Sequence, residues 1–153
     1  LYNNWGGCYN TAIGHRALEC NATGSQNTAL GNYALRNNTT GGCNNAIGRS
    51  SLSTNTEGAH NTAIGYESMR LNTTGGHNTA LGRSSLYSNT IGQYNTALGY
   101  RTLRTNTTGA GNVAIGYHAF YSNSIGTDSV AIGKQALTDA SDAADNMVSI
   151  AQS

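Results

Sequence analysis

A five-residue segment returns every seventeen residues along this chain. It reads Asn-Thr-Ala-Ile-Gly at residues 10–14 and Ser-Val-Ala-Ile-Gly at residues 129–133, and all eight copies lie in register without an insertion. A globular domain would not keep such a period, because its residues occupy different environments. A stacked solenoid would keep it, because every coil meets the same neighbours above and below. The period therefore predicts a solenoid.

Within one repeat, the fixed residues outline short strands and turns. We number each repeat from its first residue, so that coil 1 begins at Asn10 and coil 8 at Ser129. Position 3 is always Ala, position 4 is Ile or Leu, and position 9 is large and apolar. Gly and Asn tolerate left-handed backbone angles, so Gly at positions 5 and 15 and Asn at position 12 mark turns. We expect two strands per coil, at about residues 11–13 and 16–19 in coil 1, and therefore an all-β solenoid with 17-residue coils.

Two sets of residues follow from this assignment. The predicted core combines positions 4 and 9: Ile13, Leu18, Leu30, Leu35, Ile47, Leu52, Ile64, Met69, Leu81, Leu86, Leu98, Leu103, Ile115, Phe120, Ile132 and Leu137. The predicted structural turns combine positions 12 and 15: Asn21, Gly24, Asn38, Gly41, Asn55, Gly58, Asn72, Gly75, Asn89, Gly92, Asn106 and Gly109. A helical alternative fails, because it would place Gly in the middle of a helix in every copy.

The predicted core is thin for the length of backbone that each coil must order. Each coil offers about two large apolar side chains, whereas ordering seventeen residues is costly in conformational entropy. Burial against other copies of the chain would offset part of this cost. We therefore expect the protein to oligomerise. We divide the chain into a solenoid over residues 1–139, with a partial first coil at 1–9, and a terminal strand or transition segment over residues 140–153.

The composition excludes several classes of function. Only 10% of the residues are charged and the net charge is +1, so there is no electrostatic case for nucleic acid. No apolar run approaches the roughly 18 residues of a membrane span, so we expect no direct membrane insertion in this segment. The carboxylates are scattered and none recurs with a His or Ser partner. We expect no enzymatic activity and no cofactor.

Three stretches in the C-terminal part of the chain carry a family resemblance. The Ser-Val-Ala-Ile-Gly copy at residues 129–133 and the Asn-Val-Ala-Ile-Gly copy at 112–116 resemble the head repeats of trimeric autotransporter adhesins of the YadA-like type. The stretch Asp-Asn-Met-Val-Ser-Ile at residues 145–150 resembles the strand with which such heads pass into a neck. Similar repeats also occur in phage tail-fibre-like proteins. The family's usual head repeat is shorter than seventeen residues, so one turn, at the Asn-Thr-Thr-Gly corner, must be enlarged.

The resemblance implies a left-handed parallel β-roll that assembles as a homotrimer. It also implies an extracellular location, on a bacterial cell surface or a virion fibre, and attachment rather than catalysis. Its partners would be other copies of itself and a glycan or protein of a host surface. The leading hypothesis is a structural or adhesive fibre segment. The alternatives are an ice-binding β-solenoid and a passive architectural spacer of a filament.

Tyr and Arg gather at the variable positions of the repeat. Tyr and Arg are favoured at recognition hot spots, and aromatic faces suit sugars or cations. The same residues could instead fill a seam between subunits or keep the rod soluble. The candidates for a recognition or seam surface are Tyr33, Arg36, Tyr66, Arg70, Tyr87, Tyr94, Tyr100, Arg101, Arg104, Tyr117 and Tyr121.

Position 17 holds Cys43, His60 and His77 in three consecutive coils. These residue types suit a transition metal, but their spacing is dictated by the repeat, so we expect no metal site and keep the three only as weak candidates. Cys8 and Cys20 lie in adjacent coils, which allows a disulfide, while the odd number of cysteines leaves the redox compartment open.

Threonine recurs in two columns, at positions 2 and 13. A flat array of evenly spaced Thr could match an ice lattice. Asn45, Val113 and Val130 interrupt the first column, and the valines suggest a buried position. The second column falls in a turn. The asparagine columns at positions 1 and 12 are expected to form ladders that satisfy the backbone of the turns.

Overall fold

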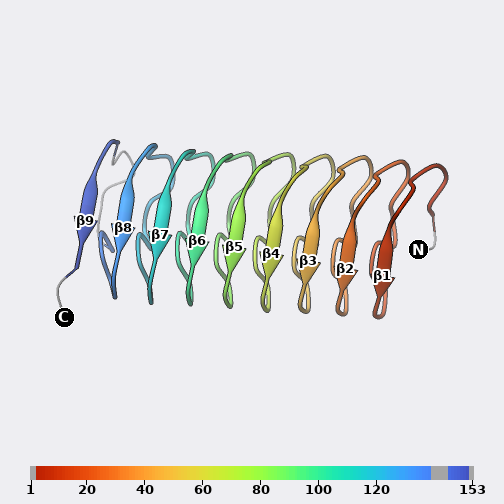
Figure 1. Ribbon diagram of the computed structural model, residues 1–153, viewed down its shortest axis with the longest axis horizontal. Coiled ribbons are helices and arrows are strands. Elements are labelled where there is room, and N and C mark those ends of the chain that lie inside the picture. The colour runs from red at the N-terminus through yellow and green to blue at the C-terminus, as the bar shows by residue number, and fades with distance from the viewer. Residues whose placement is uncertain (1–2, 139–144, 152–153) are drawn as a thin grey trace.

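Every coil contributes one three-residue strand to a single parallel sheet (Figure 1). The computed structural model describes residues 3–138 and 145–151. Its strands are β1 (Thr11–Ile13), β2 (Thr28–Leu30), β3 (Asn45–Ile47), β4 (Thr62–Ile64), β5 (Thr79–Leu81), β6 (Thr96–Leu98), β7 (Val113–Ile115), β8 (Val130–Ile132) and β9 (Val148–Ile150). They lie in sequence order, each paired in parallel with the next. The predicted all-β solenoid is confirmed.

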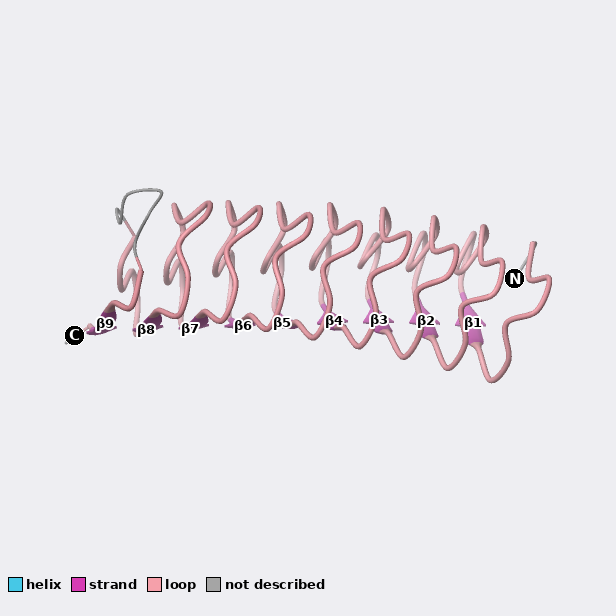
Figure 2. Ribbon diagram, turned by 90° about the horizontal axis from the view of Figure 1, so that it is seen from above, coloured by secondary structure: helices cyan, strands magenta, loops and turns pink. Residues whose placement is uncertain are grey.

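Successive strands pair with an offset of one repeat. Thr11 lies opposite Thr28, seventeen residues further on. The offset is eighteen between the last two strands, where Val130 pairs with Val148, so one additional residue precedes β9. β9 nevertheless continues the same sheet, along one side of the rod (Figure 2). The predicted division between residues 139 and 140 lies outside the described residues.

The second strand expected in each coil is absent from the described residues. Positions 6–9 form a turn, in which Arg16 has a φ of 56° and Leu18 a φ of 50°. Two left-handed residues so close together are incompatible with an extended strand. The coils remain connected here, because the Leu18 amide donates to the Ala34 carbonyl at 3.0 Å. The prediction of a strand over residues 16–19 was therefore wrong, although hydrogen bonds still join the coils.

Half of the predicted core is also wrong, because position 4 faces outward. Alternate residues of a strand point to opposite faces. Ala at position 3 points inward, so positions 2 and 4 share the outer face; Ile13 is 60% exposed and Leu81 is 48% exposed. The corrected residues, all exposed or half-buried, are Ile13, Leu30, Ile47, Ile64, Leu81, Leu98, Ile115 and Ile132. We call this row the apolar column.

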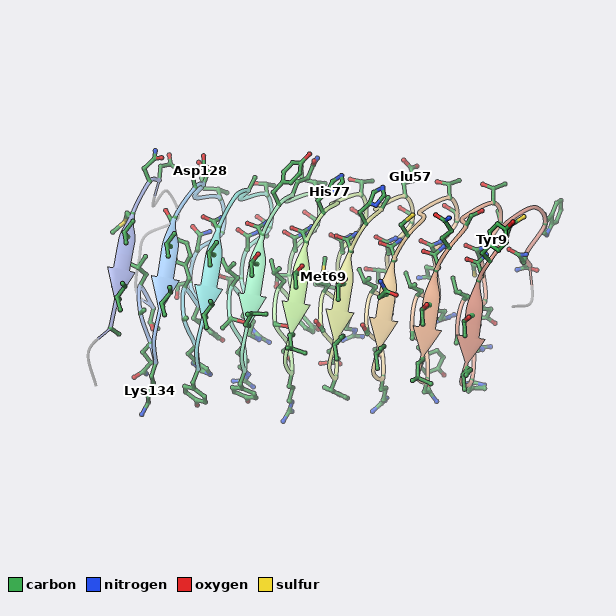
Figure 3. All side chains as sticks on the ribbon, in the orientation of Figure 1. Tyr9, Glu57, Met69, His77, Asp128 and Lys134 are labelled. Atoms are coloured by element: carbon green, nitrogen blue, oxygen red, sulfur yellow. The ribbon has the colours of Figure 1, made fainter. Side chains whose placement is uncertain are left out.

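The interior is built from position 9 and from small side chains. Leu18, Met69 and Phe120 are fully buried, and Leu137 at the same position is partly buried. They pack with Ala at position 3 and with Ala, Ser or Thr at position 8. Figure 3 shows Met69 in the middle of the rod, away from the labelled side chains along both of its long edges. The core is thus even thinner than the sequence suggested.

Two columns of asparagine, nearly all of them buried, run through coils 1–7. At position 12, Asn38 donates through Nδ2 to Asn21 Oδ1 at 2.8 Å and to the carbonyl of Gly41, three residues on, at 2.8 Å. At position 1, the amide of Asn27 donates to Asn10 Oδ1 at 2.9 Å. Each side chain therefore closes a corner of its own coil or joins it to the next, as the ladder interpretation expects.

The described residues form no helix, so none of them belongs to a helix that could cross a membrane.

Replacing Met69 with leucine should leave the fold and its stability nearly unchanged. The side chain is fully buried at a position where five other coils carry a buried leucine: Leu18, Leu35, Leu52, Leu86 and Leu103. A swap that conserves volume in a core costs less than about 1.5 kcal/mol. Thermal unfolding followed by circular dichroism measures the change. A fall of more than about 6 °C would contradict the view that all coils share one interior.

Candidate functional site

The variable Tyr and Arg residues lie mainly on the turn that follows each strand. Lys134, at position 6, lies along one long edge of the rod in Figure 3, whereas Tyr9, His77 and Asp128, all at position 17, lie along the opposite edge. Because the coils stack in register, side chains at equal positions lie over one another. Positions 6, 7 and 10 of coils 2–7 thereby form one continuous surface, which we call the Tyr–Arg surface.

One ladder of this surface follows position 6. The guanidinium of Arg83 lies 5.4 Å from the centre of the Tyr66 ring and 5.8 Å from that of Tyr100. Arg49 extends the ladder on the other side of Tyr66, at 5.7 Å. Cations alternate with rings at cation–π distance. The repeat thus places the charges between rings rather than against one another.

A second ladder follows position 10. Arg70 lies 5.9 Å from the Tyr87 ring and donates to its hydroxyl at 2.9 Å. Arg104 lies 5.0 Å from the same ring and 5.9 Å from that of Tyr121. Tyr87 is therefore held between two guanidinium groups, one from the coil before it and one from the coil after it.

A stack of four rings joins the two ladders in coils 6 and 7. Tyr117 and His118 are parallel within 7° and 4.3 Å apart. Tyr100 stacks on both of them, and Tyr121 stacks on His118 at 4.9 Å. The carbon of the Arg101 guanidinium lies 5.0 Å from the centre of the Tyr100 ring. This is the densest group of aromatic and cationic side chains on the described part of the chain.

The first coils neutralise their arginines with carboxylates. Glu19 pairs with Arg16 Nε at 3.3 Å and with Arg36 Nε at 3.0 Å. Glu67 pairs with Arg70 at 3.3 Å. Between these pairs lies a hollow of about 290 Å³, open to solvent, that Tyr33, Arg49 and Leu71 help to line. Both signs of charge face this hollow.

Coils 6 and 7 lack such pairing. Nε of Arg101, Nε of Arg104 and Nε2 of His118 are buried without a hydrogen-bond partner. Burial, and to a lesser degree the charges of Arg101 and Arg104, lower the pKa of His118 below its usual value. The imidazole is therefore neutral at pH 7 and leaves the two guanidinium groups as the local charges.

The structure brings together ten of the eleven predicted surface residues and separates the remaining one. Tyr94 lies at position 17, where its ring stacks on His77 at 5.0 Å. Arg49 and Arg83, which also lie at the variable position 6, join this surface beside Tyr66. The sequence prediction left out Glu19, Glu67 and His118. His118 shares position 7 with Arg101, so its column was the signal that could have found it.

The weak metal candidates lie apart from this surface. The rings of His60 and His77 stack face to face, 4.8 Å apart and 9° from parallel, so they do not converge on a common point. Cys43 Sγ contacts Gln26 Oε1 at 3.0 Å. Within residues 3–138 and 145–151, no group of three His, Cys, Asp or Glu side chains could hold a metal ion. Cys8, Cys20 and Cys43 are free thiols.

The two threonine columns differ in their surroundings. At position 13, Thr39 Oγ1 donates to the carbonyl of Thr56 in the next coil at 3.0 Å, and Thr73 does the same to Thr90 at 3.0 Å. These hydroxyls therefore join adjacent coils. At position 2, Thr11 and Thr79 are exposed, and Val113, which was expected to be buried, is half-buried on the same outer face.

Comparison of the chain with protein-family models, with curated proteins and with solved structures gave no match in any of the three.

Proposed function

We propose that this chain is a segment of an extracellular fibre that assembles through its sheet face and presents the Tyr–Arg surface for attachment. The observation that carries the proposal is the apolar column. Ile or Leu recurs at position 4 of all eight coils and is not fully buried in any of them. A continuous apolar row of this length on the surface is typical of a protein–protein interface.

The partner that fits the apolar column best is another copy of the chain. The column repeats in register with the parallel sheet, as in the pairing of Leu81 with Leu98. A partner without this period would match only a few coils, whereas a second copy matches along the whole column. The resemblance to trimeric adhesin heads suggests three copies around one axis, each with its sheet toward the centre. Such burial would also supplement the thin interior of each rod.

The Tyr–Arg surface supports attachment rather than a purely passive spacer. It concentrates rings and cations, which are favoured at recognition sites. Its side chains vary between coils while positions 1, 3, 5 and 12 remain nearly constant. A bacterial surface or a virion fibre is the location that the resemblance suggests. Catalysis has no support from this arrangement, because the carboxylates near the surface are paired with arginines.

Replacing Leu81 and Leu98 with asparagine should dissociate the assembly but leave the solenoid of each chain folded. Burying a leucine contributes about 1.5–3 kcal/mol, so two per protomer should weaken assembly at least about a hundredfold. Sedimentation equilibrium measures the change, and we expect a trimer for the unmodified chain. The matched control is Ile91→Asn, which removes a side chain of equal exposure (51% against 48% for Leu81) from a turn instead of the sheet face.

Two results would overturn this proposal. A well-folded monomer of the unmodified chain at micromolar concentration would show that the apolar column needs no partner. An equal loss of assembly in the Ile91 control would show that the column is not the interface. Thermal hysteresis of the purified protein would instead favour an ice-binding solenoid, which would use the exposed threonines at position 2.

A further inference from the structure

Coils 6 and 7 hold a cationic cluster whose counter-charge is missing from the described part of the chain. Arg101 and Arg104 belong to the same coil, and their Nε atoms are buried without a hydrogen-bond partner. Another nitrogen of Arg104 donates to the Tyr121 hydroxyl at the long distance of 3.4 Å. A buried, charged donor without an acceptor is costly. As wholes, the two arginine side chains are only half-buried, so a negative charge bound beside their guanidinium groups would offset this cost.

Coil 1 shows what such a counter-charge looks like in the same fold. Arg16 occupies position 7, as Arg101 does, and its Nε donates to the carboxylate of Glu19 at position 10. The other oxygen of Glu19 accepts from Nε of Arg36 in the next coil. In coil 6, position 10 is Arg104 instead of a carboxylate. The repeat therefore places a second cation where coil 1 places the anion that binds two arginines.

The surroundings of the cluster favour an anion over a cation. His118, which lies within electrostatic range of both guanidinium groups, is neutral at pH 7, and no described carboxylate forms an ion pair with either arginine. Guanidinium groups bind carboxylate and sulfate oxygens in two-point geometry. Beside them, Tyr117 is 49% exposed, and its ring belongs to the four-ring stack. A charged site thus adjoins a flat, half-exposed aromatic surface.

We propose that Arg101 and Arg104 form a binding site for the oxyanion of an acidic carbohydrate, whose ring packs on Tyr117. The carboxylate or sulfate supplies from the ligand the negative charge that Glu19 supplies to Arg16 and Arg36, because Arg104 fills position 10 in coil 6. The oxyanion site stands on the geometry of coils 6 and 7 alone. The identification of its carrier as a carbohydrate rests on the attachment function proposed above.

The sharpest test is Arg104→Glu, which gives coil 6 the carboxylate that coil 1 has. The introduced carboxylate would pair with Arg101 as that of Glu19 pairs with Arg16. We expect a higher melting temperature together with the loss of oxyanion binding. A purely structural role for Arg104 predicts no gain in stability. Arg104→Gln and Arg101→Gln, which only remove charge, should each weaken binding about tenfold or more, because each removes a charge-assisted hydrogen bond.

Binding is measured on the unmodified chain with four probes at constant ionic strength: sodium sulfate, lactose, 3′-sialyllactose and 3′-sulfolactose. Titration calorimetry gives the affinity, and the NMR signals of His118 give a local readout, since a bound oxyanion should raise its pKa. The position-matched control is Arg16→Gln, which removes the same side chain from position 7 of coil 1 and should leave binding unchanged. Tyr117→Ala should weaken the sugars but leave sulfate unaffected.

Each outcome supports or overturns a defined part of the proposal. Tighter binding of the acidic sugars than of sulfate and lactose, lost in Arg104→Glu and kept in Arg16→Gln, supports all of it. Equal binding of sulfate and the acidic sugars overturns the carbohydrate part. Absence of binding by every probe, or binding that survives Arg104→Glu, overturns the site itself. Sedimentation of the same samples shows separately whether the proposed assembly has formed.

Discussion

Replacing Gly65 with alanine should break the stack between coils 4 and 5. Gly65 has a φ of +132°, and a Cβ atom there would lie 2.5 Å from the carbonyl oxygen of Gly82. The backbone strain costs on the order of 1–3 kcal/mol, and the overlap with a backbone atom adds to it because neither coil can move without breaking its ladder. We expect a loss of at least about 3 kcal/mol and a fall in melting temperature of about 10 °C. Limited proteolysis should then cut near residues 65–83 first.

The matched control for this prediction is Gly76→Ala. Gly76 occupies position 16, where coil 3 already carries Ala59 and coil 6 carries Ala110. A Cβ atom there meets the carbonyl oxygen of Ala59 at 3.0 Å, and the φ of Gly76 is not in the left-handed region. This variant should melt within a few degrees of the unmodified chain. If both variants lost stability equally, the close approach at position 5 would not be the cause.

Replacing Asn72 with alanine should cost about 2–5 kcal/mol, the second-largest effect that we expect. Asn72 donates to Asn55 Oδ1 at 2.7 Å and to the Gly75 carbonyl at 2.9 Å, and it accepts from Asn89 at 2.8 Å. Its removal leaves buried polar atoms unpaired on both sides, at about 1–3 kcal/mol each, and a small void in addition. Hydrogen exchange should show the fastest amides at the junctions of coils 3, 4 and 5.

Thr74→Ala provides the comparison within the same turn. Its side chain is exposed, and position 14 accepts Thr, Glu or Ile in different coils. We expect a change within about 0.5 kcal/mol, as is usual for surface substitutions. If Asn72→Ala lost no more stability than Thr74→Ala, the asparagine column would not contribute to the stability of the fold.

The period alone was enough to predict the solenoid, the first strand of each coil and half of the interior. It was not enough to decide which face of the strand points inward. Ala12 and Ile13 are adjacent in a strand, so only one of them can enter the core, and apolar character favoured the larger one. That preference fails where an apolar residue is exposed on the outside of its own chain. Sequence apolarity does not distinguish burial within a chain from exposure on a face that a partner could cover.

The missed turn at positions 6–9 has a different cause. Leucine avoids left-handed backbone angles, yet Leu18 and its counterparts adopt φ near 50° in every coil. Their burial, which is complete in coils 1–7, and the hydrogen bonds between coils offset a strain that no residue propensity would reveal. Conversely, Asn21 and Gly24, expected to be left-handed, are not. Gly24 is required because a Cβ atom would overlap the carbonyl oxygen of Gly41.

The sequence was enough to predict which positions of the repeat form the candidate surface, but not which of its charged side chains form ion pairs. The variable positions identified Arg101 and Arg104 as surface residues. They did not indicate that Arg16 and Arg36 share the carboxylate of Glu19, whereas Arg101 and Arg104 have no ion pair with a described carboxylate. Pairing depends on which residues the stack places side by side, both within a coil and seventeen residues apart. The role of His118 likewise depends on the stack, which places its ring against those of Tyr117 and Tyr121.

The column of asparagines at position 12 gives the rod a direction, because its side chains all point the same way along the stack. At position 12, each asparagine from Asn21 to Asn106 donates toward the preceding coil and accepts from the following one, as in Asn38 to Asn21 and Asn55 to Asn38. The side-chain dipoles therefore align head to tail, and such chains of hydrogen bonds strengthen one another. One face of any coil presents oxygens along this column, and the other presents N–H groups. Two rods joined end to end through it can match only in the same direction, so a filament built this way would have a plus and a minus end.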